Sequence, residues 1–373
     1  MELQQTLEIQ FEEPKEKKNM ELKKQDTKDY ALLQRCIALI EQARMYVAQN
    51  VNTAMVTTYY EIGRYIVEDE QQGQQRAQYG KQVLKELSSR LTEQFGKGWS
   101  VETLKKCRTF FNTYSVEIGS TTQTESNLVH SVDQIQLPRL SWNHLQILMR
   151  IDNPAERHFY EIESVAQNWS VRQLQRQVAS SLYERLALSR DKNEVMRLAN
   201  EGQILEKSSD IIKNPLTLEF LGLKTESAYS ETKLEQAIID KMQQFLLELG
   251  KGFLFEARQK RFSFDEDNFY VDLVFYNRLL QCYVLIDLKT KKLTHQDLGQ
   301  MQMYVNYYDR YERQEWEKPT IGILLCKEKS DALVELTLPK DANIYAQQYA
   351  LCLPDKHLLQ AKLKEWIDEI EEK

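Results

Sequence analysis

The chain has 373 residues, more than one domain usually holds, so we expect two domains. Its formal net charge of -7 argues against a protein coated in nucleic acid and leaves any contact with phosphates to local basic patches. Its 5 cysteines lack C-x-x-C spacing and no apolar run approaches the roughly 18 residues of a membrane span, which predicts a reduced, cytoplasmic protein without a zinc ribbon or a disulfide framework.

The first half of the chain predicts helices. Residues 1–28 mix Glu, Lys and Gln with few large apolar groups, as is typical of a disordered tail. Apolar residues then recur at helical spacing. They mark one helix around 33–47, a second around 55–66 and a third over 79–95. We therefore expect residues 29–212 to form an all-α domain.

Two similar segments of this half each combine a turn, a helix start and basic residues. Trp169-Ser-Val-Arg-Gln-Leu174 repeats Trp99-Ser-Val-Glu-Thr-Leu104, with Ser170 and Gln173 spaced for a capping box. The basic residues that we expect on the exposed faces of these helices are Lys105, Lys106, Arg108, Arg172 and Arg176. They predict helix-turn-helix-like units that bind DNA. The alternative is that each Trp-Ser pair only starts a helix and anchors it in the core.

The second half, residues 213–373, alternates helices with apolar strands. A helix over 230–249 carries Glu235, and a strand over 253–264 carries Arg258, Lys260 and Arg261. An apolar hairpin over 269–289, a helix over 294–308 and a buried strand over 320–326 follow, before a last strand and a last helix. The order is helix, three strands, helix, strand, which predicts an α/β domain with a mixed sheet.

The hairpin carries two carboxylates, Asp272 and Asp287, where a packed strand would normally have Val or Ile. With an even-numbered loop, Asp272 would pair with an odd-numbered residue such as Leu285, and Asp287 and Lys289 would share its face one step along. Two hard oxygen donors beside an ammonium suit Mg²⁺ and the hydrolysis of phosphodiesters. The alternative is a pair of solvated or structural carboxylates.

These residues and their order resemble the PD-(D/E)xK nuclease superfamily, and within it the bacterial YhcG-like branch. The similarity runs through Arg258-Gln-Lys-Arg261, Val271-Asp-Leu-Val-Phe-Tyr-Asn-Arg278, Leu285-Ile-Asp-Leu-Lys-Thr290 and Leu293 to Tyr304. In the first half it rests on Tyr60-Glu-Ile-Gly-Arg64, Phe95-Gly-Lys-Gly98, Ser141-Trp142 and Trp169-Ser-Val-Arg172. The resemblance implies a restriction-endonuclease-like αβββαβ core that follows a helical domain.

The resemblance also implies roles for individual residues. Asp272 and Asp287 match the metal-binding acids, and Lys289 matches the catalytic lysine. Glu235 matches the acid that many members carry on the first helix, although Glu231, Asp240 and Glu248 share that region. Gln300 matches the glutamine on the second helix. The basic residues Arg258, Lys260, Arg261, Lys291 and Lys292 are then expected to contact the phosphate backbone.

The sequence therefore predicts a nuclease that uses Mg²⁺ or Mn²⁺ to hydrolyse DNA, with a helical domain that binds nucleic acid or a partner. A non-catalytic DNA-binding or assembly subunit with the same fold is the alternative, and RNA as the substrate stays open. Because one active site cuts one strand, a homodimer is the default expectation, with other nucleic-acid-processing proteins as further partners.

Overall fold

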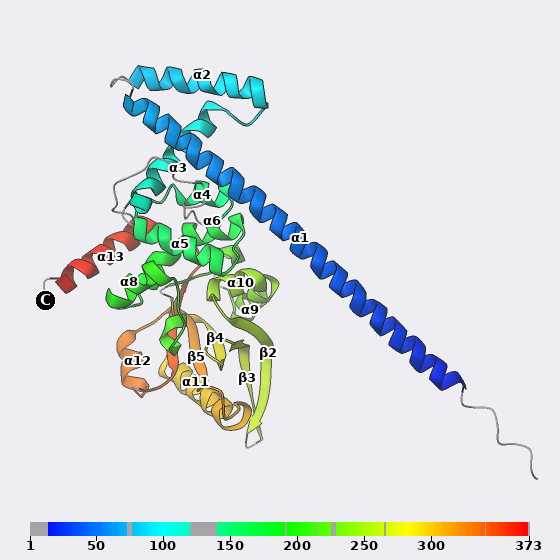
Figure 1. Ribbon diagram of the computed structural model, residues 1–373. Coiled ribbons are helices and arrows are strands. Elements are labelled where there is room, and N and C mark those ends of the chain that lie inside the picture. The colour runs from blue at the N-terminus through cyan, green and yellow to red at the C-terminus, as the bar shows by residue number, and fades with distance from the viewer. Residues whose placement is uncertain are drawn as a thin grey trace, which may run out of the picture. The chain divides into compact units, whose positions relative to one another are not determined.

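The computed structural model describes residues 14–72, 77–119, 140–190, 192–213, 215–224, 229–264, 266–339 and 341–371 (Figure 1). The chain divides into two compact units between Trp142 and Asn143. The domain boundary that the sequence predicts near residue 213 therefore lies inside the second unit. Within the described residues, no helix is both long enough and apolar enough to cross a membrane.

The described residues of the first unit include the helices α1 (Pro14–Gln72), α2 (Ala77–Phe95) and α3 (Val101–Gly119). The prediction of separate helices around 33–47 and 55–66 is wrong, because α1 runs through both. Neither Gly nor Pro interrupts the sequence between Pro14 and Gly63, so nothing breaks the helix. It begins at Pro14, within the segment 1–28 that we expected to be disordered, and residues 1–13 lie outside the described residues.

The core of this unit forms where α1 crosses α3. Ile66 of α1, Leu84 of α2 and Leu104 of α3 form a buried cluster, and Trp99 packs against it. Gly63 allows the crossing, since a Cβ at this position would lie 2.1 Å from the carbonyl oxygen of Cys107. Trp99 thus anchors the start of α3 in the core, as the alternative to a DNA-binding unit expects.

The second unit opens with five helices, of which α4 spans the division between the units. They are α4 (Trp142–Leu148), α5 (Pro154–Ala166), α6 (Val171–Ala179), α7 (Leu182–Ala187) and α8 (Lys192–Glu201). The predicted capping box at the start of α6 is confirmed, because the Ser170 and Gln173 side chains each bond the other residue's backbone N–H. Trp169 is buried, so this Trp-Ser pair also anchors a helix.

A buried ion-pair network joins these helices to the α/β core. Glu248 is fully buried and pairs with Arg185 of α7 and, at 3.1 Å, with Arg176 of α6. Arg176 also lies 2.9 Å from Glu219, and Lys213 donates to the carbonyl oxygen of Glu248. Removing one partner from such a network leaves an uncompensated buried charge. Residues 143–224 therefore pack with the sheet, which explains why the compact units do not divide near residue 213.

A mixed six-stranded sheet forms the centre of the second unit, in the order β1-β6-β5-β4-β3-β2. Its strands are β1 (Leu216–Thr217), β2 (Phe253–Phe264), β3 (Asp267–Asn277), β4 (Cys282–Lys292), β5 (Ile321–Glu328) and β6 (Ile344–Ala350). Strands β2, β3 and β4 pair antiparallel, whereas β5 runs parallel to β4, β6 to β5 and β1 to β6. The predicted αβββαβ order and mixed sheet are confirmed.

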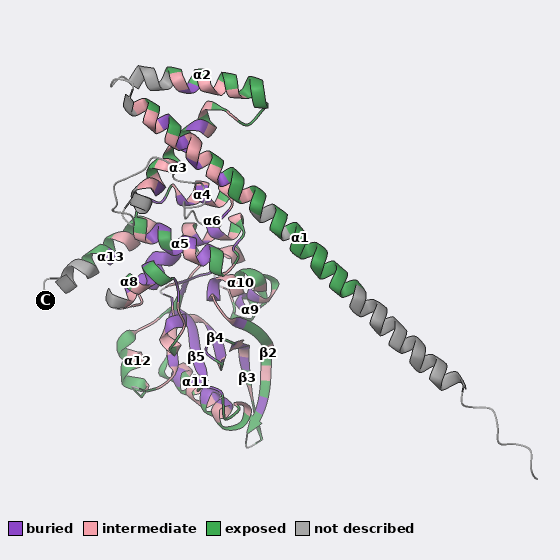
Figure 2. Ribbon diagram, in the orientation of Figure 1, coloured by how far each residue is buried: buried purple, intermediate pink, exposed green. Residues whose placement is uncertain are grey.

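Helices cover both faces of this sheet. On one face, α9 (Glu231–Asp240) and α10 (Met242–Leu249) pack on Leu273, Phe275, Ile286 and Leu288. On the other, α11 (His295–Tyr307) and α12 (Asp331–Thr337) pack on Val274, Leu285 and Leu324. Alternate residues of each strand thus enter opposite cores, and Figure 2 shows β4 and β5 buried along most of their length.

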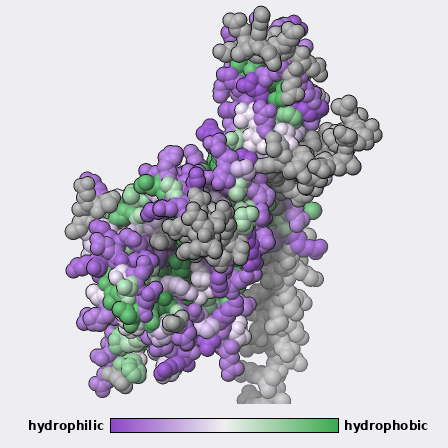
Figure 3. Space-filling model, turned by 90° about the vertical axis from the view of Figure 1, so that its left-hand side faces the viewer, coloured by the Kyte–Doolittle hydropathy of each residue, from purple (hydrophilic) through white to green (hydrophobic). Residues whose placement is uncertain are grey.

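Smaller elements complete the unit. The single helix predicted over 230–249 is interrupted at Lys241, where the backbone leaves helical geometry, and neither Gly nor Pro marks this position in the sequence. Short turns of helix lie at Ser208–Ile211, Glu219–Leu221 and Tyr308–Glu312, and α13 (Lys356–Glu371) follows β6. On the face shown in Figure 3 hydrophilic side chains predominate, and hydrophobic ones form smaller patches.

Candidate active site

The register of β3 and β4 places the two predicted carboxylates opposite each other. Leu273 pairs with Ile286, and Asn277 pairs with Cys282 across the turn. Continued by one residue, this register sets Asp272 against Asp287. The predicted parity is therefore confirmed, but the predicted partner is wrong, since Leu285 pairs with Val274. Because facing residues of paired strands share a face, the two carboxylates emerge side by side.

Asp272 is half-buried and held by two donors. The backbone N–H of Leu288 on β4 donates to its Oδ2 at 2.8 Å, and the side-chain amide of Gln259 on β2 donates to its Oδ1 at 2.9 Å. Burial raises the pKa of Asp272 above its usual value, and nearby Glu235 adds to the rise, while the two donors oppose it. The strands on either side thus fix the direction of this carboxylate.

Asp287 is almost completely buried, with 3% of its surface exposed. Its buried Oδ2 forms an ion pair with Nζ of Lys289 at 2.7 Å, and within the residues that the structure describes no group meets this oxygen with hydrogen-bond geometry. Burial and the charge of Asp272 raise the pKa of Asp287 to about 7, although Lys289 opposes the rise. A cation beside Asp287 would remove the cost of its negative charge.

Lys289 lies between two carboxylates. Besides Asp287, its Nζ lies 3.8 Å from Oδ1 of Asp297, a residue that also caps the start of α11 by bonding Thr294. Burial disfavours the ammonium form, but Asp287, Glu231 and Asp297 outweigh it and hold the pKa of Lys289 above its usual value. Lys289 is therefore an ammonium at neutral pH and acts as a donor and a positive charge.

Glu235 of α9 reaches the strand site through Gln259. The Gln259 amide nitrogen lies 2.7 Å from Oε2 of Glu235 and also donates to Asp272, so one donor bridges two carboxylates. The other Glu235 oxygen pairs with Nε of Arg258, which further donates to Gln236. Gln259 has a φ of +48°, a left-handed conformation that is uncommon for residues other than glycine. Arg258, expected to contact phosphate, is instead engaged by the site's own carboxylate.

Gln300 lies on α11, the helix that covers the same face of the sheet. Its side-chain amide donates to the hydroxyl of Tyr304. The pKa of Tyr304 is raised by burial and by the nearby charge of Asp287. The structure thus brings Gln300 to the neighbourhood of the carboxylates through Tyr304.

The donor set fits a hard divalent cation. The carboxylates of Asp272 and Asp287 lie on neighbouring strands, close enough for Asp272 to raise the pKa of Asp287, and one buried oxygen of Asp287 meets no hydrogen-bonding group of the described residues. Oxygen ligands of this kind suit Mg²⁺ or Mn²⁺. Among the described residues, however, no three of the types His, Cys, Asp and Glu already form a group that could hold a metal. Both oxygens of Glu235, the third carboxylate of this region, are bound by Gln259 and Arg258.

The predicted basic residues are in different environments. Lys291, Lys292 and Arg261 are exposed near the site, and Arg261 bonds Asn268, while Lys260 is half-buried. In the helical half, Arg172 is exposed, as is Lys105, which lies 3.8 Å from Glu102; Lys106 is half-buried. Arg108 pairs with Glu70 of α1 at 2.8 Å. The prediction that Arg176 is exposed is wrong, because it belongs to the buried network of Glu248 and Glu219.

Sequence reasoning missed three groups in the site. Gln259 was part of a basic strand segment, and no sequence signal marks a residue that bridges Glu235 and Asp272. Asp297 was recognisable as an N3 capping residue, yet its distance to Lys289 depends on the fold. The N–H of Leu288 belongs to the backbone and has no sequence signature.

The comparisons with known proteins agree with this organisation. Residues 209–364 match the family described as "YhcG PDDEXK nuclease domain", and residues 35–185 match the "DUF1016 N-terminal domain". The chain is similar to the Escherichia coli (strain K12) protein described as "Putative nuclease YhcG", at 37% identity over 88% of this chain and 91% of the relative.

Part of the chain is also similar to two solved structures. One is described as "crystal structure of a repair endonuclease from Pyrococcus abyssi", with 16% identity, a TM-score of 0.23, and coverage of 35% of this chain and 50% of that one. The other is described as "Structure of EndoMS-dsDNA2 complex", with 16% identity, a TM-score of 0.25, and coverage of 36% and 50%. The chain thus spans half the length of each of these structures.

Proposed function

Because the chain belongs to the family in which a DUF1016 N-terminal domain precedes a YhcG PDDEXK nuclease domain, we propose that it hydrolyses phosphodiester bonds of DNA with the help of Mg²⁺ or Mn²⁺. The observation that carries this proposal is the opposition of Asp272 and Asp287 on neighbouring strands, with Lys289 2.7 Å from Asp287. A metal-dependent nuclease needs carboxylates for the cation and a positive charge where the phosphate becomes more negative.

Each residue has a distinct task in this proposal. Asp272 and Asp287 would hold the metal, which when bound polarises a phosphate oxygen and lowers the pKa of a water. The Leu288 N–H keeps Asp272 aimed at the site. The ammonium of Lys289 donates to the attacking water and stabilises the charge that develops on the phosphate. Gln300 and Tyr304 form the wall beside Asp287.

Glu235 is proposed as an additional metal ligand that binds only after a conformational change. It can contribute an oxygen to the metal only when the Gln259 amide turns away, because that amide now bonds it. Arg258 keeps the other oxygen of Glu235 neutralised. We therefore assign the metal first to Asp272 and Asp287, with Glu235 added on binding, while Lys260, Arg261, Lys291 and Lys292 are the proposed contacts to the DNA backbone.

The test is a cleavage assay on plasmid, linear, single-stranded and branched DNA, and on RNA, with and without Mg²⁺ or Mn²⁺. Asp272→Ala and Lys289→Ala should abolish cleavage. The matched controls are Asp267→Asn at the far end of β3 and Lys327→Ala on β5, both exposed, which should cut like the parent. Cleavage of no substrate by the parent, or undiminished cleavage by both site variants, would disprove the assignment, and cleavage of RNA alone would correct the substrate.

A second function is favoured by one observation, the ion pair between Arg258 and Glu235, which supplies within the chain a positive charge that a metal would otherwise provide. In this alternative the core is a non-catalytic DNA-binding or assembly subunit. The two functions differ in metal binding. Mn²⁺ should raise the melting temperature of the nuclease, and Asp287→Asn should remove the effect, whereas the non-catalytic core should show no shift in either form.

The helical half would contribute nucleic-acid or partner binding in either case. Lys105, Lys106 and Arg172 are the proposed contacts. Their replacement by Ala should weaken DNA binding and reduce its salt dependence by about one unit of slope per lost phosphate contact. If binding of the triple variant equals that of the parent at every salt concentration, this half does not bind DNA through these helices.

A further inference from the structure

Helix α1 carries an exposed apolar stripe along its middle. Alternating steps of four and three residues separate Leu33, Ile37, Ile40, Arg44, Val47 and Val51. The exposed fractions of the apolar members are large, at 54% for Leu33, 52% for Ile40, 60% for Val47 and 54% for Val51. This spacing is the a and d pattern of a coiled coil, in which the stripe packs against another helix.

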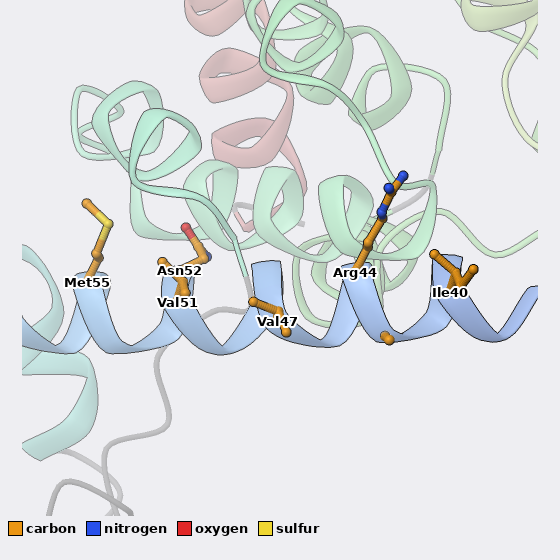
Figure 4. Close-up of a pocket in the computed structure, with 7 residues that line it drawn as sticks. Ile40, Arg44, Val47, Val51, Asn52 and Met55 are labelled. Carbon is orange, nitrogen blue, oxygen red and sulfur yellow. The ribbon is translucent and has the colours of Figure 1, made fainter. Parts of the chain in front are cut away.

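Nearer its C-terminal end α1 packs against α3, whereas the residues of the stripe are exposed. From Val56 onwards α1 contacts α3, and Val56, Tyr60 and Ile66 are buried. Before that point, Ile40, Arg44, Val47, Val51, Asn52 and Met55 line a shallow groove along α1 (Figure 4). The stripe therefore lies on a different side of α1 from the residues that pack against α3, and an apolar groove on such an open side is a surface suited to a partner.

We propose that this stripe is the contact between two copies of the chain, joined as an antiparallel coiled coil around a two-fold axis near residue 42. The charge of Arg44 favours an antiparallel pair of copies over a parallel pair. In a parallel pair in register, Arg44 would pack against Arg44 of the other copy, so two like charges would meet in an apolar seam. An antiparallel pair separates them.

In the antiparallel register the apolar residues of the stripe also pack against apolar residues of the other copy. Leu33 of one copy meets Val51 of the other, Ile37 meets Val47, and Arg44 meets Ile40 beside Glu41. Arg44 and Glu41 have no ion pair within the described part of the chain, so both are available for this contact. Two Arg and two Glu side chains would then alternate around the axis. The stripe spans about three heptads, the shortest length at which such a pattern is a reliable coiled-coil signal.

The first experiment measures the mass of the full chain in solution by light scattering over a range of concentrations. The parent should be a dimer, and Ile40→Glu with Val47→Glu should be a monomer of unchanged helix content. The matched control is Leu39→Glu with Tyr46→Glu, exposed apolar residues of the same helix outside the stripe, which should stay dimeric. A monomeric parent, or a dimer that survives the stripe substitutions, overturns the proposal.

Two further variants test the orientation. Arg44→Glu should weaken the dimer by placing four carboxylates at the axis, and Arg44→Glu with Glu41→Arg should restore it.

In a Cys36→Ser, Cys352→Ser background, a mixture of Leu33→Cys and Val51→Cys chains should cross-link with each other on oxidation. Cross-linking of like with like would show a parallel pair. A stripe substitution that lowers the melting temperature of a monomeric chain would show that a segment of the same chain, and no other copy, covers the stripe, and would overturn the proposal.

Discussion

The ammonium of Lys289 lies 2.7 Å from the buried Oδ2 of Asp287, and the two groups form an ion pair. Even with this neighbour, burial and Asp272 raise the pKa of Asp287 to about 7 from 3.8. Between these two pH values Asp287 therefore carries a proton in the folded metal-free protein but is ionised in the unfolded chain. Stability from this group is fully present at low pH and is lost as the pH rises through about 7.

We accordingly expect Asp287→Asn to stabilise the metal-free protein at pH 8 by about 1–4 kcal/mol and to remove the slope of stability against pH between 3.8 and about 7. Urea unfolding in EDTA at several pH values measures this difference. Asp267→Asn, which replaces an exposed carboxylate, is the control. An Asn variant whose unfolding free energy parallels that of the parent at all pH values would show that Asp287 is ionised throughout.

Gln259 bridges Glu235 and Asp272 with one amide nitrogen. Gln259→Glu replaces this donor with a third carboxylate, so we expect the metal-free protein to lose about 1–3 kcal/mol at pH 8. The same change adds an oxygen ligand, so Mn²⁺ should raise the melting temperature more than in the parent. Thermal unfolding with and without Mn²⁺ checks both effects, with the exposed Gln296→Glu as the control. A variant that gains no extra metal response would place Gln259 outside the metal site.

Arg176 and Arg172 lie on one helix but should have different roles. Arg176→Met leaves Glu248 with one fewer partner in a buried network, and we expect a loss of about 3–5 kcal/mol of unfolding free energy. Arg172→Met removes an exposed charge and should change stability by less than about 0.5 kcal/mol. Chemical denaturation of both variants measures the contrast. Similar stabilities for the two variants would mean that the network does not hold α6 to the core.

Gly63 permits the close approach of α1 and α3. In Gly63→Ala the new Cβ would lie 2.1 Å from the carbonyl oxygen of Cys107, so the helices must separate. We expect a loss of about 1–3 kcal/mol. Gly299→Ala in α11 is the matched control, because its Cβ would meet no atom within 4 Å. That change should instead stabilise by about 0.5–1 kcal/mol. Circular dichroism during urea unfolding distinguishes these opposite signs.

The sequence predicted the site's carboxylates because a charged residue in an apolar strand is conspicuous and side chains alternate along a strand. It did not predict the register, because an even loop of two, four or six residues preserves the same parity. The turn holds four residues between Asn277 and Cys282. Asp287 therefore lies opposite Asp272, whereas the prediction placed it one step further along the strand.

Long-range partners explain the remaining differences. Arg176 was expected on the exposed face of a basic helix, but its partner Glu248 lies far along the sequence and no local pattern connects them. Arg258 of β2 was expected to contact phosphate, but Glu235 of helix α9, 23 residues earlier in the chain, binds it. The continuity of α1 was open to prediction, since the absence of Gly and Pro is a local property.

The antiparallel arrangement of β2, β3 and β4 has a consequence for how the protein folds. Asp272, Asp287, Lys289 and Gln259 all lie on strands that are consecutive in the chain, so short loops close the distances between them. The pairing of β1 with β6 instead joins segments that are far apart in the sequence, and such contacts form slowly. The candidate active site is therefore encoded in the part of the sheet with the lowest contact order, and its residues can meet before the sheet is complete.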